Sequence, residues 1–427
     1  MRREGRPIVI IGAGLAGVVC ARLLLRAGLS VVVLEREETM GGRVRTTVTA
    51  EGYRIDRGFQ VLFAAYPALL RHVALSALEP RYFRSGTYVV RSGRMLDLGH
   101  PLYDARSLPA TVSSGLIAPR DAAALTRLLW KARGFGDAPL PAGQGSTHQT
   151  LQAAGISETF IRNVAVPFFG GVSFDRSLST DAAFFGLVLR TLAVGRAFLP
   201  AYGVQRLPEL LAADFPAGTV EYGRKVDRVL IDGNRVVGVE TDAGIVASET
   251  VVVATEAQVA RELTGISTPS GSRSSVTAYF SSDRPLYEGA KTVVHAEEGL
   301  VNEIVQLTNV APEYAPSGRH LLSATVLRDM EEGEAATAAA IADDIRGWFP
   351  RARNVGLEPV AVVRVPYAQF DQPPGIYGRL PTCRTATDGL FLAGEYLHSS
   401  SIQGAIRGGE MAADAVLASI SNNGSRV

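Results

Sequence analysis

Cysteine and histidine are scarce in this chain of 427 residues, and no sign of charge predominates. Two cysteines, Cys20 and Cys383, are too few for a disulfide framework or a cysteine-based metal site. The six histidines have no ligand-like spacing, so no metal is expected. Lys and Arg number 43 against 42 Asp and Glu, and this balance gives no electrostatic reason to expect a nucleic-acid partner.

Long hydrophobic runs are also missing. The longest uncharged apolar run, residues 7–21, is shorter than the roughly 20 residues that cross a bilayer. It follows Arg2 and Arg3 like an export signal, but its glycines have the spacing of a nucleotide-binding loop. We therefore expect a cytoplasmic protein. Apolar residues make up 47% and charged residues 20%, which is ordinary globular usage and excludes disorder and coiled coil.

Glycine is abundant, and its most informative cluster lies near the N-terminus. Gly12, Gly14 and Gly17 follow the β-branched run 8–11 and open a helix expected to extend to residue 27. In this GxGxxG pattern the first glycine permits a tight turn and the second lets the backbone approach a diphosphate. The third lets the helix pack closely against the sheet. The pattern predicts a dinucleotide-binding βαβ unit.

The rest of that unit supports the same interpretation. The free N–H groups of the first helical turn, at Leu15 and Ala16, and its positive dipole end favour a phosphate. A second buried strand, 31–34, ends at Glu35, whose carboxylate suits the hydroxyls of an adenosine ribose.

A second glycine pair suggests a ligand longer than a single nucleotide. Gly41 and Gly42 precede Arg43, a guanidinium placed to neutralise or order a diphosphate. Further on, Gly58 would let the backbone approach a flat ring, while Asp56 suits either a turn cap or a functional role.

Together these motifs resemble the superfamily of flavin amine oxidases, carotenoid (phytoene) desaturases and protoporphyrinogen oxidases. Residues 389–395 and 401–409, nearly 400 positions later, are similar to its second FAD motif. Residues 56–62 and 167–171 resemble a poorly characterised desaturase-like subgroup. The resemblance covers the whole chain. It implies FAD, bound without a covalent link because no cysteine lies near the second motif.

The resemblance also implies a place along FAD for each matching position. Arg36 would lie beside the adenine, and Val226 would contact it through its backbone. The remaining implied contacts follow the diphosphate, ribityl chain and ring: Gly41, Gly42, Arg43, Gly58, Phe59, Gln60, Gly394, Glu395, Gln403, Gly404 and Ala405. The last three begin a helix whose N–H groups would stabilise negative charge on a reduced flavin.

The implied fold class is α/β. A discontinuous Rossmann-like FAD-binding domain of the glutathione-reductase type would comprise residues 1–75, 201–265 and 386–427. An inserted α+β substrate-binding domain would comprise 76–200, expected to be mostly helical, and 266–385. Turn signals separate strands near 226–231, 235–241 and 245–248, with a buried strand at 251–254. Helices are predicted at 335–349 and 403–419.

The reaction that the resemblance favours is dehydrogenation or desaturation of a hydrophobic or polycyclic small molecule. An amine or amino-acid oxidase that uses O₂ is the first alternative, although Ser399–Ile402 replace the aromatic residue expected there. A redox-neutral isomerase or cyclase with reduced FAD is the second. A flavin-binding protein without chemistry and an NADP-dependent dehydrogenase are further readings, and the Gly41–Arg43 and Gly394–Glu395 motifs argue against the last.

Few catalytic side chains are obligatory when a flavin performs the chemistry. The candidates are His398, Tyr367 and Gln60. Phe168, Phe169, Tyr367 and Phe370 are candidate walls of a substrate pocket.

Two further features bear on partners. Lys291 has no flavin-lysine context and is expected to be a solvated surface lysine. Residues 118–135 are expected to form an amphipathic surface helix or a homodimer contact. Peripheral membrane contact would need a basic amphipathic anchor, which nothing in the sequence marks.

Overall fold

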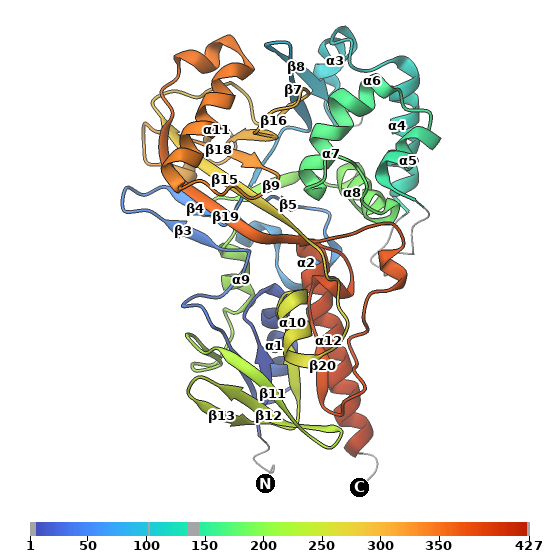
Figure 1. Cartoon of the computed structure of the whole chain (residues 1–427), viewed down its shortest axis with the longest axis vertical. Helices are drawn as coiled ribbons and strands as arrows, with labels where there is room; N and C mark the ends of the chain where they lie inside the picture. Colours follow the sequence, from blue (N-terminus) through green and yellow to red (C-terminus); the bar gives the residue numbers. More distant parts are fainter. Residues whose placement is uncertain (1–5, 101–102, 135–144, 425–427) are drawn as a thin grey trace.

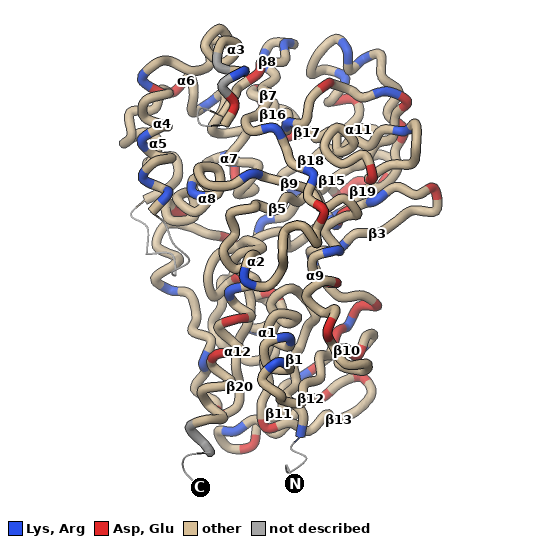
Figure 2. The backbone as a smooth tube through the Cα atoms, turned by 180° about the vertical axis from the view of Figure 1, so that it is seen from behind, with Lys and Arg blue, Asp and Glu red and all other residues tan. Residues whose placement is uncertain are grey.

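The computed structural model describes residues 6–100, 103–134 and 145–424. It has two stacked halves, and both ends of the chain lie at the lower end of the molecule (Figure 1). The fold is mixed α/β, with parallel and antiparallel sheets. Acidic and basic residues are interspersed over both halves (Figure 2).

The lower half is built on a five-stranded parallel sheet with the order β10-β2-β1-β14-β20. Its strands come from distant parts of the chain: β1 (Ile8–Ile11), β2 (Val31–Leu34), β10 (Val220–Glu221), β14 (Val251–Val253) and β20 (Leu390–Leu392). When these five strands are numbered along the chain, their order in the sheet is 3-2-1-4-5, which is typical of nucleotide-binding parallel sheets. The four strands other than β10 are almost completely buried, which explains why each of them is a continuous apolar run.

Helices α1 (Leu15–Arg26) and α12 (Ile402–Gly424) pack against each other beside this sheet. Glycine makes the close packing possible. A methyl group on Gly17 would lie 2.0 Å from the carbonyl oxygen of Gly12, and one on Gly409 would lie 2.4 Å from that of Ala16. The first and last motifs of the chain are thereby brought into contact.

The upper half contains a seven-stranded sheet with the order β19-β15-β18-β17-β16-β7-β8. Its strands are β7 (Gly86–Arg91), β8 (Arg94–Gly99), β15 (Ser272–Ser282), β16 (Thr292–His295), β17 (Glu303–Gln306), β18 (His320–Val326) and β19 (Glu358–Phe370). Helix α11 (Glu334–Trp348) covers one face, with Trp348 buried in a shared core. Because side chains alternate along a strand, the opposite face is free to line a site.

A group of helices lies beside that sheet in the upper half (Figure 1). The group comprises α3 (Leu108–Ser113), α4 (Pro119–Ala132), α5 (Thr147–Ala153), α6 (Glu158–Phe160), α7 (Val166–Ser173) and α8 (Ala182–Val194). Within the described residues, no helix is both long and apolar enough to cross a membrane. Trp130 projects from α4 and is 73% exposed.

Smaller elements complete the fold. They are β3 (Thr46–Val48), β4 (Arg54–Asp56), β5 (Leu62–Phe63), β6 (Pro80–Tyr82), β9 (Ala197–Pro200), β11 (Val226–Asp232), β12 (Arg235–Thr241), β13 (Gly244–Ala247), α2 (Pro67–His72), α9 (Arg206–Leu211) and α10 (Ala257–Thr264).

The expectation that residues 76–200 are mostly helical was incomplete. This stretch also contains β6, β7, β8 and β9, and the β7–β8 hairpin forms one edge of the seven-stranded sheet. The hairpin turns at Ser92 and Gly93, both with positive φ, a geometry that favours tight two-residue turns.

Candidate functional site

One cavity of about 1010 Å³ connects the two halves of the molecule. At its lower end it is lined by residues that follow the carboxyl ends of β1 and β2. At its upper end it is lined by the open face of the seven-stranded sheet and by helices α7 and α8. A polar end therefore continues into a chamber rich in Phe and Leu.

Gly14 shows that the lower end is shaped for something other than the chain itself. A methyl group on Gly14 would have no atom within 4 Å, although this residue lines the cavity. By contrast, a methyl group on Gly17 would overlap the Gly12 carbonyl. Packing thus requires glycine at position 17, whereas position 14 leaves room for a ligand to approach the backbone.

Other backbone groups surround the open space at Gly14. Leu15 and Ala16 begin α1 and line the cavity, and the N–H groups of a first helical turn have no acceptor within their own helix. Gly42 has a φ of +59°, and a methyl group there would lie 3.4 Å from the Cα of Gly14. Gly41 also lines the cavity, so two glycine-containing turns meet.

Glu35 lies at the end of β2 and is buried. Its Oε2 accepts a hydrogen bond from the N–H of Ala13 at 2.6 Å, and its Oε1 accepts one from the N–H of Glu37 at 2.9 Å. A carboxylate offers about four acceptor positions. The side chain is therefore held in place by the backbone and still has acceptor capacity toward the cavity that it lines.

Arg43 links three distant segments at the middle of the cavity. Its Nη2 lies 2.6 Å from Oε1 of Glu395, and its Nη1 donates to the carbonyl of Ala368 at 2.9 Å. The guanidinium carbon lies 5.2 Å from the centre of the Tyr367 ring. Burial disfavours the charge on Arg43, but Glu395 outweighs this effect and raises the pKa of Arg43.

Most of the other predicted site residues also line this cavity. Gln60 does so while its Nε2 donates to the carbonyl of Arg43 at 2.7 Å. The remaining predicted residues in the lining are Gly12, Arg36, Gly58, Phe59, Val226, Gly394, Ala405, Phe168, Phe169 and Tyr367.

Five predicted residues lie outside the cavity lining. Gly17 and Gly404 are packing glycines, since a methyl group on Gly404 would lie 1.9 Å from the carbonyl oxygen of Ser399. Gln403 is turned to the backbone of α2, where its Oε1 accepts from the N–H of Ala68 at 3.0 Å.

Phe370 and His398 also lie outside the cavity lining. Phe370 is 1% exposed and belongs to the core around the parallel sheet, so it is not a pocket wall. His398 is buried with its Nδ1 3.0 Å from Oγ of Ser399, and its acid–base role stays a prediction. The predicted N–H groups of Gly404 and Ala405 are also occupied, because both donate to Ser401.

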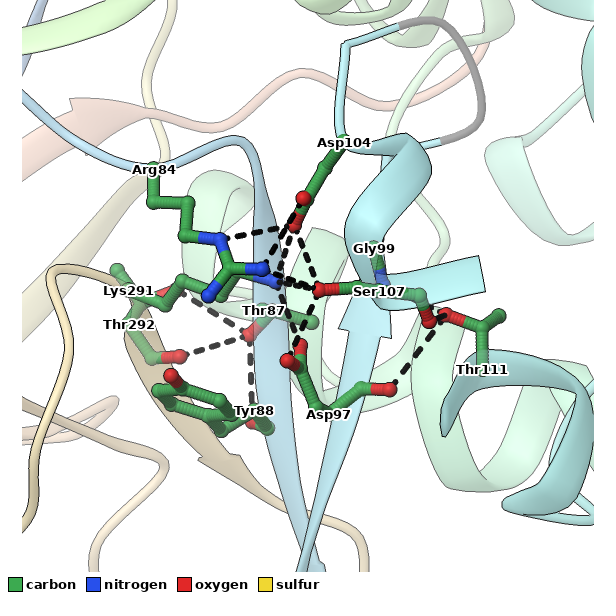
Figure 3. A network of polar contacts seen from close by, with 10 residues as sticks. All are labelled: Arg84, Thr87, Tyr88, Asp97, Gly99, Asp104, Ser107, Thr111, Lys291 and Thr292. Carbon is green, nitrogen blue, oxygen red and sulfur yellow. Dashed lines mark hydrogen bonds and ion pairs between the residues drawn. The ribbon is translucent and has the colours of Figure 1, made fainter. Parts of the chain in front are cut away.

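The expectation for Lys291 was wrong. It is completely buried, and its Nζ lies 2.5 Å from Oδ1 of Asp97 and 2.8 Å from Oδ2 of Asp104. Figure 3 shows these groups converging with Arg84 and Ser107 at the base of the β7–β8 hairpin. A lysine is stable there because two carboxylates compensate its charge.

Asp104 shows how strongly this network is coupled. Burial alone would raise the pKa of its carboxyl group. Hydrogen bonds from Lys291, Ser107 and Arg84 outweigh that effect and hold the pKa far below its usual range. Arg84 also lines the cavity, so the network supports the upper chamber wall.

Sequence reasoning missed one titratable residue of the upper chamber, Glu303. It begins β17, lines the cavity, and has a pKa raised to about 7 by burial. The only signal in the sequence was a charged residue at the start of a short apolar strand. Nothing local shows that this strand faces a cavity.

Comparison with known proteins places the chain in a family. A family model described as flavin containing amine oxidoreductase matches residues 15–417, so the chain belongs to this family and is an oxidoreductase. The family implies a flavin cofactor.

Individual relatives are more distant. The chain is 28% identical to phytoene dehydrogenase from Streptomyces griseus over 60% of this chain and 56% of that protein. It is 27% identical to hydroxysqualene dehydroxylase from Rhodopseudomonas palustris over 97% of this chain and 99% of that protein. The fold is also similar to the crystal structure of a putative protoporphyrinogen oxidase from Exiguobacterium, with a TM-score of 0.75 at 16% identity over 97% of this chain and 99% of that one.

The residues present fit a flavin dinucleotide. The open space at Gly14, the first turn of α1 and the buried Glu35, together called the cradle, would suit the nucleotide part, and the cavity continues past Gly58 and Gln60 into the upper chamber. Cys383, by contrast, is buried outside the cavity lining.

Proposed function

We propose that this protein binds FAD without a covalent link and dehydrogenates or desaturates a long hydrophobic small molecule. One observation carries the proposal: the cradle around Gly14 and the apolar chamber are parts of a single cavity. The relatives named phytoene dehydrogenase and hydroxysqualene dehydroxylase support an isoprenoid as the class of substrate.

Each part of the cavity would then have a role. When bound, FAD supplies an acceptor for a hydride and its electrons. The turn at Gly12 and Gly14 and the N–H groups of α1 hold the diphosphate, and Glu35 accepts from the ribose. The pair of Arg43 with Glu395 keeps the cavity's middle polar while neutralising a buried charge.

The chamber walls would orient the substrate and exclude water. Phe168 and Phe169 on α7, with Phe184 and Leu187 on α8, line the chamber with apolar side chains. Burying a long hydrocarbon against them yields about 25 cal/mol for each Å² removed from water. In this proposal, residues 1–75, 201–265 and 386–427 bind FAD, and residues 76–200 and 266–385 enclose the substrate.

The test has two stages. Purified protein should be yellow, and heat or acid should release all of its FAD into the supernatant. Under anaerobic conditions, isoprenoid substrates should bleach the flavin, whereas simple amines should not. Bleaching by amines alone, with peroxide formed when air is admitted, would replace the proposal with an amine oxidase.

A further inference from the structure

Glu303 is a carboxylate without a partner in the upper chamber. No hydrogen bond or ion pair joins its side chain to another residue in the described part of the chain, although it lines the cavity. The seven-stranded sheet contributes no other carboxylate to that lining, as far as its residues are described. The other acidic lining residues lie around the parallel sheet: Glu35, Glu37, Asp227, Glu256, Glu262 and Glu395.

Glu303 stands at the end of a polar row across three neighbouring strands. It is directly opposite Thr325 of β18, and Thr325 is directly opposite Thr277 of β15. Directly paired residues point to the same face of a sheet, and all three line the cavity. The hydroxyl oxygens of Thr277 and Thr325 lie 3.5 Å apart.

The row leads toward the predicted position of the flavin ring. A methyl group on Gly58 would lie 3.9 Å from Oγ1 of Thr277. Adjacent strands are about 4.8 Å apart, so two strand spacings separate Thr277 from Glu303 by about 10 Å. A substrate lying along the row would thus place one end near Gly58 and another group near Glu303.

Helix α7 forms the opposite wall, and its Gly171 packs against Asn302 with Glu303 in ordinary contact distance. Gly171 lies within helix α7, where glycine is an unfavourable residue. A methyl group on Gly171 would lie 2.8 Å from Nδ2 of Asn302 and 3.5 Å from Oε2 of Glu303. Phe168 and Phe169 on the same helix make the surroundings apolar.

Burial acts on Glu303 without any opposing charge. Burial is the one cause that raises the pKa of Glu303, and no neighbouring charged group contributes. Burial raises the pKa of Glu303 to about 7, so a neutral carboxyl group is accessible near neutral pH. A carboxyl group and a threonine hydroxyl both complement an alcohol.

We propose that Glu303, with Thr325 and Thr277, forms a hydroxyl-binding site, and that the substrate is an alcohol-bearing apolar molecule. The proposed substrate is therefore neither a pure hydrocarbon nor an amine. This inference rests on the proposed function in that the substrate occupies the upper chamber.

The experiment measures dissociation constants of three chain-matched probes by calorimetry, using the FAD-loaded protein. The probes are farnesol, farnesylamine and farnesene, which differ in the polar group. The wild type should bind farnesol about tenfold more tightly than farnesene, as expected for a hydrogen bond to a buried polar group. Glu303→Leu should reduce this ratio to about one. Glu303→Gln, which still donates and accepts, should keep most of it.

Two further variants serve as a substitute for Glu303→Leu and as a control. Thr325→Val should also lower the ratio without removing a charge, and it serves if Glu303→Leu does not fold. Glu298→Leu, at an exposed position outside the cavity, should leave the ratio unchanged.

Other outcomes would overturn the inference. Equal affinities for farnesol and farnesene in the wild type would remove the hydroxyl site. Preference for farnesylamine that is lost in Glu303→Gln would assign an ammonium site instead. FAD content, measured separately by absorbance, distinguishes either result from failure of the proposed function.

Discussion

Replacing Lys291 by Met tests whether the buried charge network is a true structural element. The Nζ group is completely buried between Asp97 and Asp104. Removing one partner of a buried ion pair costs about 3–5 kcal/mol, because a charge remains uncompensated. Asp104 would still pair with Arg84, and the side chain of Asp97 is 25% exposed to water. We therefore expect the lower end, about 3 kcal/mol.

The assay is urea unfolding followed by tryptophan fluorescence, with Trp348 of α11 as a buried reporter in the core beneath the seven-stranded sheet. Lys225→Met is the matched control, because its Nζ also lies 2.8 Å from an aspartate, Asp227, but these side chains are 67% and 45% exposed. The control should show no measurable shift.

Adding Asp97→Asn to Lys291→Met should recover part of the loss, because it removes the carboxylate whose ion-pair partner is gone, whereas Asp104 keeps Arg84. Equal midpoints for Lys291→Met, Lys225→Met and the wild type would refute the reasoning.

Three further predictions concern other groups. Gly14→Ala should fold with unchanged stability and lose FAD, whereas Gly17→Ala should lose stability, as measured by unfolding and flavin absorbance. Burial raises the pKa of Asp56 from 3.8 to about 6, so the folded state holds this proton more tightly. This contribution to stability is full below pH 3.8 and should be lost progressively as the pH rises from 3.8 to about 6, by about 3 kcal/mol in all. Comparing urea unfolding of the wild type with that of Asp56→Asn isolates it. Arg43→Met should cost about 3 kcal/mol, and adding Glu395→Gln should recover part of it in thermal unfolding.

Each of these has a clear contrary result. Retained FAD in Gly14→Ala would show that the open space is not a ligand cradle. An identical pH profile in wild type and Asp56→Asn would remove the titration assigned to that group. A double variant less stable than Arg43→Met alone would mean that Glu395 is stabilised by something other than the arginine.

The N-terminal unit was predicted almost to the residue. The predicted strands at 8–11 and 31–34 and the helix that begins after Gly14 match the structure. Farther along the chain, the strands predicted to begin at 226, 235 and 251 also begin at these residues. These elements are governed by short-range signals: apolar runs, glycine punctuation and turn residues.

The missed hairpin β7–β8 illustrates the limit of such signals. One of its strands, β8, lies at a sheet edge and begins with the exposed Arg94 and Met95, so it lacks the continuous apolar run of a buried strand. Its stability depends on pairing between β7 and β16, two segments about 200 residues apart. Such long-range pairing leaves no local pattern.

The sequence by itself determined the family, the nucleotide-binding turn and the distribution of the key glycines over both ends of the chain. Those features depend on neighbouring residues and on backbone conformations that glycine alone permits. Only the tertiary structure decided that Lys291 is buried, that Phe370 and His398 are removed from the cavity, and that Glu303 faces it. The environment of a side chain is set by segments far away in the sequence, and a charge is tolerated only where those segments bring it a partner or a ligand.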